Sequence, residues 1–259
     1  MPDVAPVTSA RCPARLFRLM VDIAAPSGGG DDSRHRLHYR SRCDDGRHRK
    51  RYDGAVQAKN ERRRSPARAR MVRSAATLMR ERGIHGVGLR EIVTHSGGPR
   101  GSLGRYFPGG KTQLMTEAID VALAELFDEV DRALTEVETF ADAIGAIVAP
   151  WRRLLVDHDF ALGCPLAATV VDAADNDYLR VHVSELLARW QASVADVYVK
   201  FGDPPAVADE QSTLLLTALE GALILARARR STEPLDTVER YFASRASARK
   251  PETGPSRNS

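Results

Sequence analysis

Residues 68–111 read RARMVRSAATLMRERGIHGVGLREIVTHSGGPRGSLGRYFPGGK. Apolar residues recur in this stretch at spacings of three and four before Gly83, again after Gly88, and a last time around Leu103. Glycine-containing breaks separate the three apolar segments. The pattern predicts three short helices joined by tight turns, which is the arrangement of a helix-turn-helix unit.

The third segment carries polar side chains opposite its apolar positions. These polar residues are Arg100, Ser102, Arg105 and Tyr106. Base edges in the major groove are read by donors and acceptors that project from a helix, and phosphates are bound by cations and backbone N–H groups. The segment therefore predicts binding to double-stranded DNA, although three short helices with glycine turns also occur as purely structural units.

The residues GGPRGSLGRYFPGGKTQL, from Gly97 to Leu114, resemble the DNA-binding domain of the TetR family. PRGSL followed by FPGGK is similar to the subfamily of lincomycin-resistance-type and flavonoid-responsive repressors, and GCPL at residues 163–166 is a second match. The resemblance implies an all-α fold, with an N-terminal three-helix helix-turn-helix DNA-binding domain on a larger C-terminal helical bundle for ligand binding and dimerisation. It also implies a homodimeric repressor that releases a palindromic operator when a small aromatic or amphipathic effector enters the bundle.

DNA contacts are expected on and beside the three-helix segment. A helix predicted from Lys111 to about residue 136 presents free N–H groups and a lysine charge to a phosphate. Gly104 stands where the family usually has an aromatic residue, which removes one phosphate contact, and Gly98 before Pro99 predicts a looser turn. The predicted DNA-contacting residues are Arg64, Arg68, Arg100, Gly101, Ser102, Arg105, Tyr106 and Lys111.

The charge of the chain is divided unevenly. The 259 residues carry a formal net charge of +4, but residues 1–107 hold 23 Lys+Arg against 10 Asp+Glu and the remainder 15 against 24. A cationic N-terminal part, at +13, on an acidic body, at −9, fits a polyanion-binding module joined to one that does not touch DNA.

Other features exclude several functional classes. The sequence lacks an uncharged apolar run long enough for a membrane span, and its three cysteines are far apart, as in reduced cytoplasmic proteins. It shows neither metal-ligand spacing nor paired carboxylates nor a phosphate loop. We therefore expect no metal, no cofactor, no catalytic residues and no membrane partner.

Composition divides the chain into four parts. Residues 1–64 are predicted to be a disordered basic extension, which is either an arm that follows DNA or a segment outside the native protein. Residues 65–110 form the predicted DNA-binding domain, and residues 111–248 the ligand-binding and dimerisation domain. Residues 249–259 are expected to be a disordered tail.

A ligand pocket is expected in the C-terminal bundle where a helix is broken. Thr139 can cap a helix that continues to about residue 158, and Pro150 inside it predicts a kink. The alternative is ordinary core packing, with an inert buried thiol at Cys164. The residues predicted to contact the effector are Trp151, Phe160, Cys164 and Trp190.

The segment from Pro205 to Arg230 is apolar on nearly every side, with Glu220 its only charge between Glu210 and Arg227. Such a helix has to be covered on two sides, and a second copy of the chain is the expected cover. A last helix, from residue 234 to about 246, adds to this surface. The predicted dimer interface comprises Leu215, Leu219, Ala222, Leu223 and Tyr241.

Two other classes of function compete with the effector-responsive regulator. One is a DNA-binding protein without an effector, for which a packed interior around Trp151, Cys164 and Trp190 would be the sign. The other is a small-molecule enzyme or carrier, which the absence of recognisable catalytic groupings disfavours.

Overall fold

A computed structural model describes residues 65–99, 101–172 and 175–245 of the chain. Within these ranges every regular element is an α-helix, so the predicted all-α class is confirmed. The predicted N-terminal extension and C-terminal tail lie outside the described residues. The helices are α3 (Pro66–Arg82), α4 (Leu89–His95), α5 (Leu103–Tyr106), α6 (Gly110–Leu134), α7 (Phe140–Asp157), α8 (Pro165–Asp172), α9 (Asp177–Lys200), α10 (Pro205–Arg229) and α11 (Glu233–Ser244).

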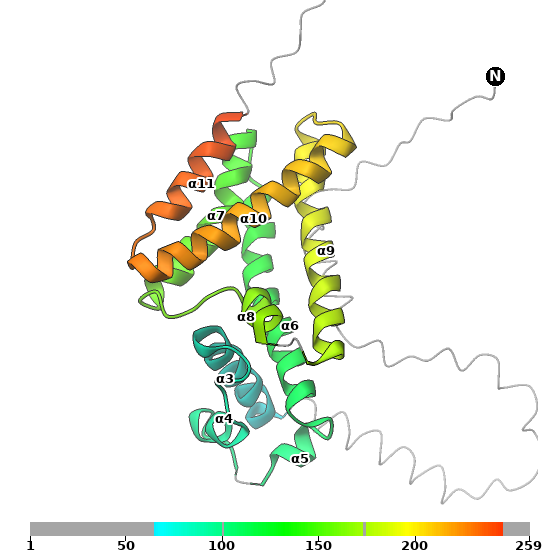
Figure 1. Cartoon of the computed structure of the whole chain (residues 1–259), viewed down its shortest axis with the longest axis vertical. Helices are drawn as coiled ribbons and strands as arrows, with labels where there is room; N and C mark the ends of the chain where they lie inside the picture. Colours follow the sequence, from blue (N-terminus) through cyan, green and yellow to red (C-terminus); the bar gives the residue numbers. More distant parts are fainter. Residues whose placement is uncertain (1–64, 100, 173–174, 246–259) are drawn as a thin grey trace, which may run out of the picture.

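The helices α3, α4 and α5 lie together at one end of the molecule, at the bottom of Figure 1. From there α6 runs up into the bundle formed by α7, α9, α10 and α11. α3 packs along α6, α10 packs against both α9 and α11, and α11 packs against α7. α6 is therefore the element that both parts of the molecule share.

The turn between α4 and α5 is fixed by glycines. Gly97 has φ +60°, its N–H donates to the Thr94 carbonyl, and the Gly98 N–H donates to the Val93 carbonyl, which together close the end of α4 in a Schellman motif. A Cβ on Gly98 would lie 2.3 Å from Cε of Met71, a fully buried side chain. Gly98 thus allows α3 to pack closely under the turn, rather than loosening it as the sequence predicted.

Helix ends in the C-terminal bundle follow the sequence signals. Thr139 accepts from the Asp142 N–H while the Asp142 side chain accepts from the Thr139 N–H, so the two form a capping box at the start of α7. Pro150 lies inside α7, as expected. Asn176 caps α9 through the Leu179 N–H. None of the described helices combines the length and apolar content that crossing a membrane requires.

Glu220 is a carboxylic acid inside the bundle. It lies on α10 beside the buried Cys164, and neither of its oxygens accepts from a nitrogen or oxygen donor of the described residues. Burial raises the pKa of Glu220, and a hydrogen bond with the Cys164 thiol acts in the opposite direction. The folded protein therefore disfavours the ionised form of Glu220 relative to the unfolded chain.

Glu220→Gln is expected to raise the free energy of unfolding at pH 7. Below the unfolded pKa of about 4.3 the acid is neutral in both states and carries no penalty, whereas the penalty grows as the pH rises towards and through the raised folded pKa. The gain should therefore shrink as the pH is lowered. Urea unfolding at several pH values measures it, with Glu210→Gln, at an exposed position of the same helix, as the control. An equal effect of the two substitutions would contradict the assignment.

Candidate nucleic-acid interface and dimer surface

α5 is a single helical turn, and only part of its predicted polar face is exposed. Gly101, Gly104 and Arg105 are exposed, but Ser102 and Tyr106 are each only 8% exposed. The Ser102 hydroxyl donates to the Pro99 carbonyl at 2.7 Å, so it supports the turn. The expectation that these polar side chains face outward is wrong for Ser102 and Tyr106, which are buried against the rest of the protein.

Arg105 is the exposed cation of this turn, and Tyr106 positions it. The Arg105 guanidinium lies over the Tyr106 ring at 5.1 Å from its centroid and donates to its hydroxyl at 3.2 Å. The same hydroxyl receives a hydrogen bond from Ser65, whose side chain therefore does not cap α3. Hydrogen bonds from Ser65 and then Arg105 lower the pKa of Tyr106. Tyr106 thus links the start of α3 to the exposed arginine.

Arg68 is engaged inside the protein. Its Nη2 lies 2.6 and 2.5 Å from the two carboxylate oxygens of Glu117, and its guanidinium lies 4.8 Å from the centroid of the Phe107 ring. These contacts tie α3 to α6 and occupy the charge that was expected to meet a phosphate. Arg64 and Arg100, which were also expected to contact DNA, lie outside the described residues.

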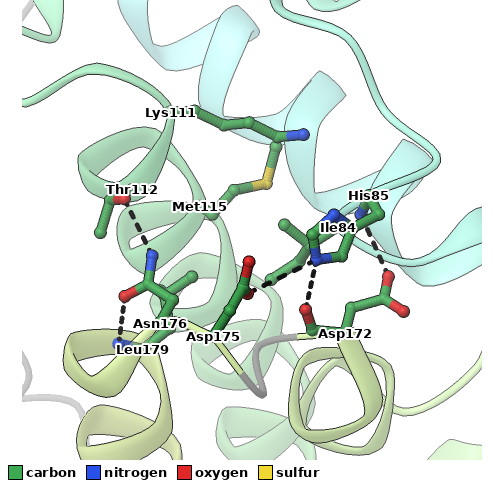
Figure 2. Close-up of a pocket in the computed structure, with 9 residues that line it drawn as sticks. All are labelled: Ile84, His85, Lys111, Thr112, Met115, Asp172, Asp175, Asn176 and Leu179. Atoms are coloured by element: carbon green, nitrogen blue, oxygen red, sulfur yellow. Dashed lines mark hydrogen bonds and ion pairs between the residues drawn. The ribbon is translucent and has the colours of Figure 1, made fainter.

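Lys111 lies in the wall of a recess of about 170 Å3 between the two parts of the molecule (Figure 2). Across it, the His85 N–H donates to an Asp172 carboxylate oxygen at 3.1 Å, and Asn176 donates to the Thr112 hydroxyl at 3.2 Å. The recess therefore lies at a junction between the segment after α3, the start of α6, and the α8–α9 connection.

Sequence reasoning missed a set of exposed cations on the N-terminal helices. Arg70, Arg73 and Arg90 are exposed, and Nε of Arg70 donates to the Ser96 carbonyl at the end of α4. Their exposure depends on how α3 and α4 pack together, which no local motif records.

The predicted ligand-contacting side chains are packed against one another. Trp151 and Trp190 are almost fully buried with ring centroids 5.7 Å apart, and Phe127 lies at the same distance from Trp190. Burial, and then the Glu220 carboxylate, raise the pKa of the Cys164 thiol well above its usual value, which disfavours a reactive thiolate. Phe160 is partly buried against the same core. These residues form core packing, the alternative that the sequence left open.

A wider recess, of about 360 Å3, opens beside Pro150 on α7 and has none of these four predicted residues in its wall. Its apolar wall comes from Ala122, Leu126, Pro150 and Leu154. Its polar wall comes from Arg80, Glu125, Glu129, Arg153, Asp157 and His158.

Most of the predicted dimer residues belong to the protomer's own core. Leu215, Leu219, Ala222 and Leu223 are buried within the single chain, and only Tyr241 is exposed. The face of α10 that remains exposed is a different one. We call it the α10 stripe, and it comprises Leu214, Thr217, Gly221, Ile224, Leu225 and Ala228. The predicted residues of α10 therefore face the protomer's own bundle, because an apolar pattern all round a helix does not define its rotation.

Comparison with known proteins gives the family. Residues 72–118 match the family of bacterial regulatory proteins named after TetR, and residues 141–241 match the C-terminal domain of LmrA/YxaF-like transcriptional regulators. An uncharacterised helix-turn-helix-type transcriptional regulator of Mycobacterium tuberculosis, Rv0196, is 40% identical over 192 residues, which cover 71% of this chain and 96% of the relative.

This chain belongs to the TetR family.

Further relatives support the membership and the subfamily. The helix-turn-helix-type regulator LmrA of Bacillus subtilis is 25% identical over 170 residues, which cover 65% of this TetR-family chain and 90% of LmrA. The structure of a TetR transcriptional regulator of Chloroflexus aurantiacus is similar, with 25% sequence identity and a TM-score of 0.60. The match covers 73% of this chain and 95% of that regulator. A TetR regulator of Legionella pneumophila shares the fold at 14% identity, with a TM-score of 0.63 over 70% of this chain and 98% of its own. The predicted family and subfamily are thus confirmed, and the chain is a transcriptional regulator by membership.

Arg105→Ala is expected to weaken binding to selected duplex DNA by an amount equivalent to about 1–3 kcal/mol, because a guanidinium contact to a base or phosphate is lost. Its thermal stability should change little, since the side chain is exposed. Gly104→Ala is the matched control: a Cβ there meets no atom within 4 Å, and alanine should stabilise the turn by roughly 0.5–1 kcal/mol. Fluorescence anisotropy measures both, and unchanged affinity of Arg105→Ala for every sequence would remove Arg105 from the interface.

Proposed function

We propose that this protein is a homodimeric repressor that acts in the cytoplasm, binds a palindromic operator, and releases it when a small aromatic or amphipathic effector binds the C-terminal domain. Membership in a family of transcriptional regulators supports the DNA-binding part of this proposal. The α10 stripe is the observation that supports dimer formation. An enzyme or carrier has no comparable support from the relatives found, which are regulators.

The α10 stripe has the properties of a covered surface. Ile224 is 66% exposed and Leu214 and Leu225 nearly half exposed, and all lie within one helix beside the smaller Thr217 and Gly221. At about 25 cal/mol per Å2, covering these side chains with a second copy removes an unfavourable contact with water. A Cβ on Gly221 meets no atom within 4 Å, which leaves room for close approach of a partner helix. Tyr241 on α11 is exposed as well and extends the surface.

A two-fold axis through the α10 stripe explains how a one-turn recognition element can suffice. Two copies present two α5 turns to two half-sites, and a palindromic operator repeats the contacts of one half-site in the other. Lys111 and the exposed arginines Arg70, Arg73 and Arg90 supply phosphate contacts in this arrangement. Gly101, at φ +82°, keeps the backbone before α5 free of a side chain.

The effector is assigned to the recess beside Pro150, in place of the packed tryptophan core. Its volume of about 360 Å3 lies within the usual range of ligand sites, roughly 300–1,000 Å3. Apolar and charged side chains share its wall, which suits an amphipathic molecule better than a purely apolar one. A regulator without an effector remains the competing reading, and the packed core favours it.

Ile224→Glu is expected to raise the dissociation constant of the dimer by about a hundredfold, roughly 3 kcal/mol, because pairing would bury an unmatched charge. The secondary structure of the chain should be unchanged, since Ile224 is exposed in the single chain. Sedimentation velocity and operator titration measure the two effects. Val181→Glu, at a 47% exposed valine on α9, should sediment like the wild type. If dimers of Ile224→Glu persist at wild-type concentrations, the interface lies elsewhere.

Leu154→Trp is expected to fill the recess beside Pro150 and to abolish the response to any effector, while DNA binding is retained. The screen uses aromatic and amphipathic compounds, with thermal shift and operator release as the readouts. Val156→Trp is the control, because Val156 is exposed on the same helix and is not in the wall of the recess. If no compound stabilises the wild type or releases DNA, the protein is instead a regulator without an effector.

A further inference from the structure

The C-terminal end of α3 is completed by residues of the bundle. A helix leaves the carbonyls of its last turn without partners inside the helix, so each needs a donor from elsewhere. The Met79 carbonyl accepts from the Gly83 N–H at 2.8 Å, within the same segment. The carbonyls of Arg80 and Glu81 accept instead from Gly163 and Arg227, at 3.1 Å in both cases.

Arg227 reaches this helix end from α10. Its Nη2 donates to the Glu81 carbonyl and, at 2.8 Å, to the Ala161 carbonyl, while its Nε lies 3.4 Å from the Phe160 carbonyl. One guanidinium thereby joins α10, the end of α3 and the connection between α7 and α8. A guanidinium offers several N–H donors in a fixed plane, which a lysine ammonium does not.

Arg80 on α3 also forms hydrogen bonds with the α7–α8 connection. Nε of Arg80 donates to the Gly163 carbonyl at 2.9 Å, and the Gly163 N–H donates back to the Arg80 carbonyl. Arg80 is only 7% exposed, and burial lowers the pKa of its guanidinium, although not enough to remove the charge of an arginine. A Cβ on Gly163 would lie 2.7 Å from Nη1 of Arg227, so an alanine here would force the guanidinium to shift.

We call Arg80, Gly163 and Arg227, with the hydrogen bonds that they make, the clamp. Arg227 of the clamp and the α10 stripe lie on the same turns of α10. Arg227 follows Ile224 and Leu225 and precedes Ala228, all of which are exposed in the stripe. Arg227 therefore connects the helix that carries the α10 stripe directly to the end of α3, separately from α6.

We propose that Arg227 is a positioning residue for operator binding: by capping the end of α3 from the dimer helix, it fixes the DNA-binding unit relative to the dimer axis and so sets the separation of the two half-sites. The proposal rests on the proposed dimeric repressor. Two recognition elements bind successive major grooves only at a separation of roughly 34–36 Å, so a loosened unit loses affinity for the correct spacing and tolerates wrong ones.

The test compares the affinities of the whole chain for three kinds of duplex. The first is the sequence that the wild-type protein selects from random DNA, the second has base pairs inserted between its halves, and the third keeps one half only. Arg227→Ala is expected to sediment as a dimer and to bind the half-site duplex like the wild type. On the full duplex it should bind roughly tenfold more weakly, a common size for coupling between sites, and it should distinguish the inserted duplexes less well.

Three further variants separate positioning from stability. Arg227→Lys should restore part of the affinity, since its ammonium can still donate to one of the carbonyls. Arg229→Ala, whose side chain pairs with Glu233 at the surface, should behave as the wild type. Gly163→Ala leaves Arg227 in place but displaces its guanidinium, and should reproduce the loss of spacing preference even if Arg227→Ala does not fold.

Full affinity and unchanged spacing preference of folded Arg227→Ala, or of folded Gly163→Ala, would overturn the inference while leaving the proposed function intact. A wild-type protein that selects no DNA sequence would overturn the proposed function, and the inference with it.

Discussion

α6 joins the two parts of this molecule because its side chains are buried in both of them. Near its start Leu114 and Met115 are fully buried, and further along Phe127 packs against Trp190 in the bundle. A helix of 25 residues is about 37 Å long, so a single continuous helix makes both contacts. The Arg68–Glu117 pair adds a charged contact between α6 and α3 at the end where DNA is expected to bind. The position of the recognition turn relative to α10 therefore depends on how firmly α6 is packed.

α6 is not the sole connection between the described parts of the bundle and the N-terminal unit. The clamp formed by Arg80, Gly163 and Arg227 holds the opposite end of α3. Two separated attachments restrict rotation as well as translation, whereas a single helix would leave the unit free to swing. The polar junction of His85 with Asp172 is a further connection, but it lies at the exposed surface, so it contributes less to this restraint.

Much of the fold follows from local sequence signals, and most helix ends lie within a residue or two of their predicted positions. Thr139 with Asp142, Pro205 and the glycines at 97 and 98 identify helix ends through the chemistry of the backbone. The features that sequence reasoning misplaced depend on packing between distant segments. The side on which α10 faces its own bundle cannot be read from a helix that is apolar all round, so the sequence alone did not show that Leu219 faces the protomer's own bundle. Arg68 and Arg227 find partners 49 and 146 residues away, respectively, so no local pattern indicates that their charges are engaged within the chain.

The central claim is that two copies of this chain read two half-sites at a separation fixed by their own packing. Hydroxyl-radical footprinting of the whole chain on the duplex that it selects from random DNA tests this claim most directly. The account predicts two protected stretches on one face of the duplex, with centres about 34–36 Å apart or a multiple of that separation. A single protected stretch at saturation, or two stretches on opposite faces of the helix, would contradict it.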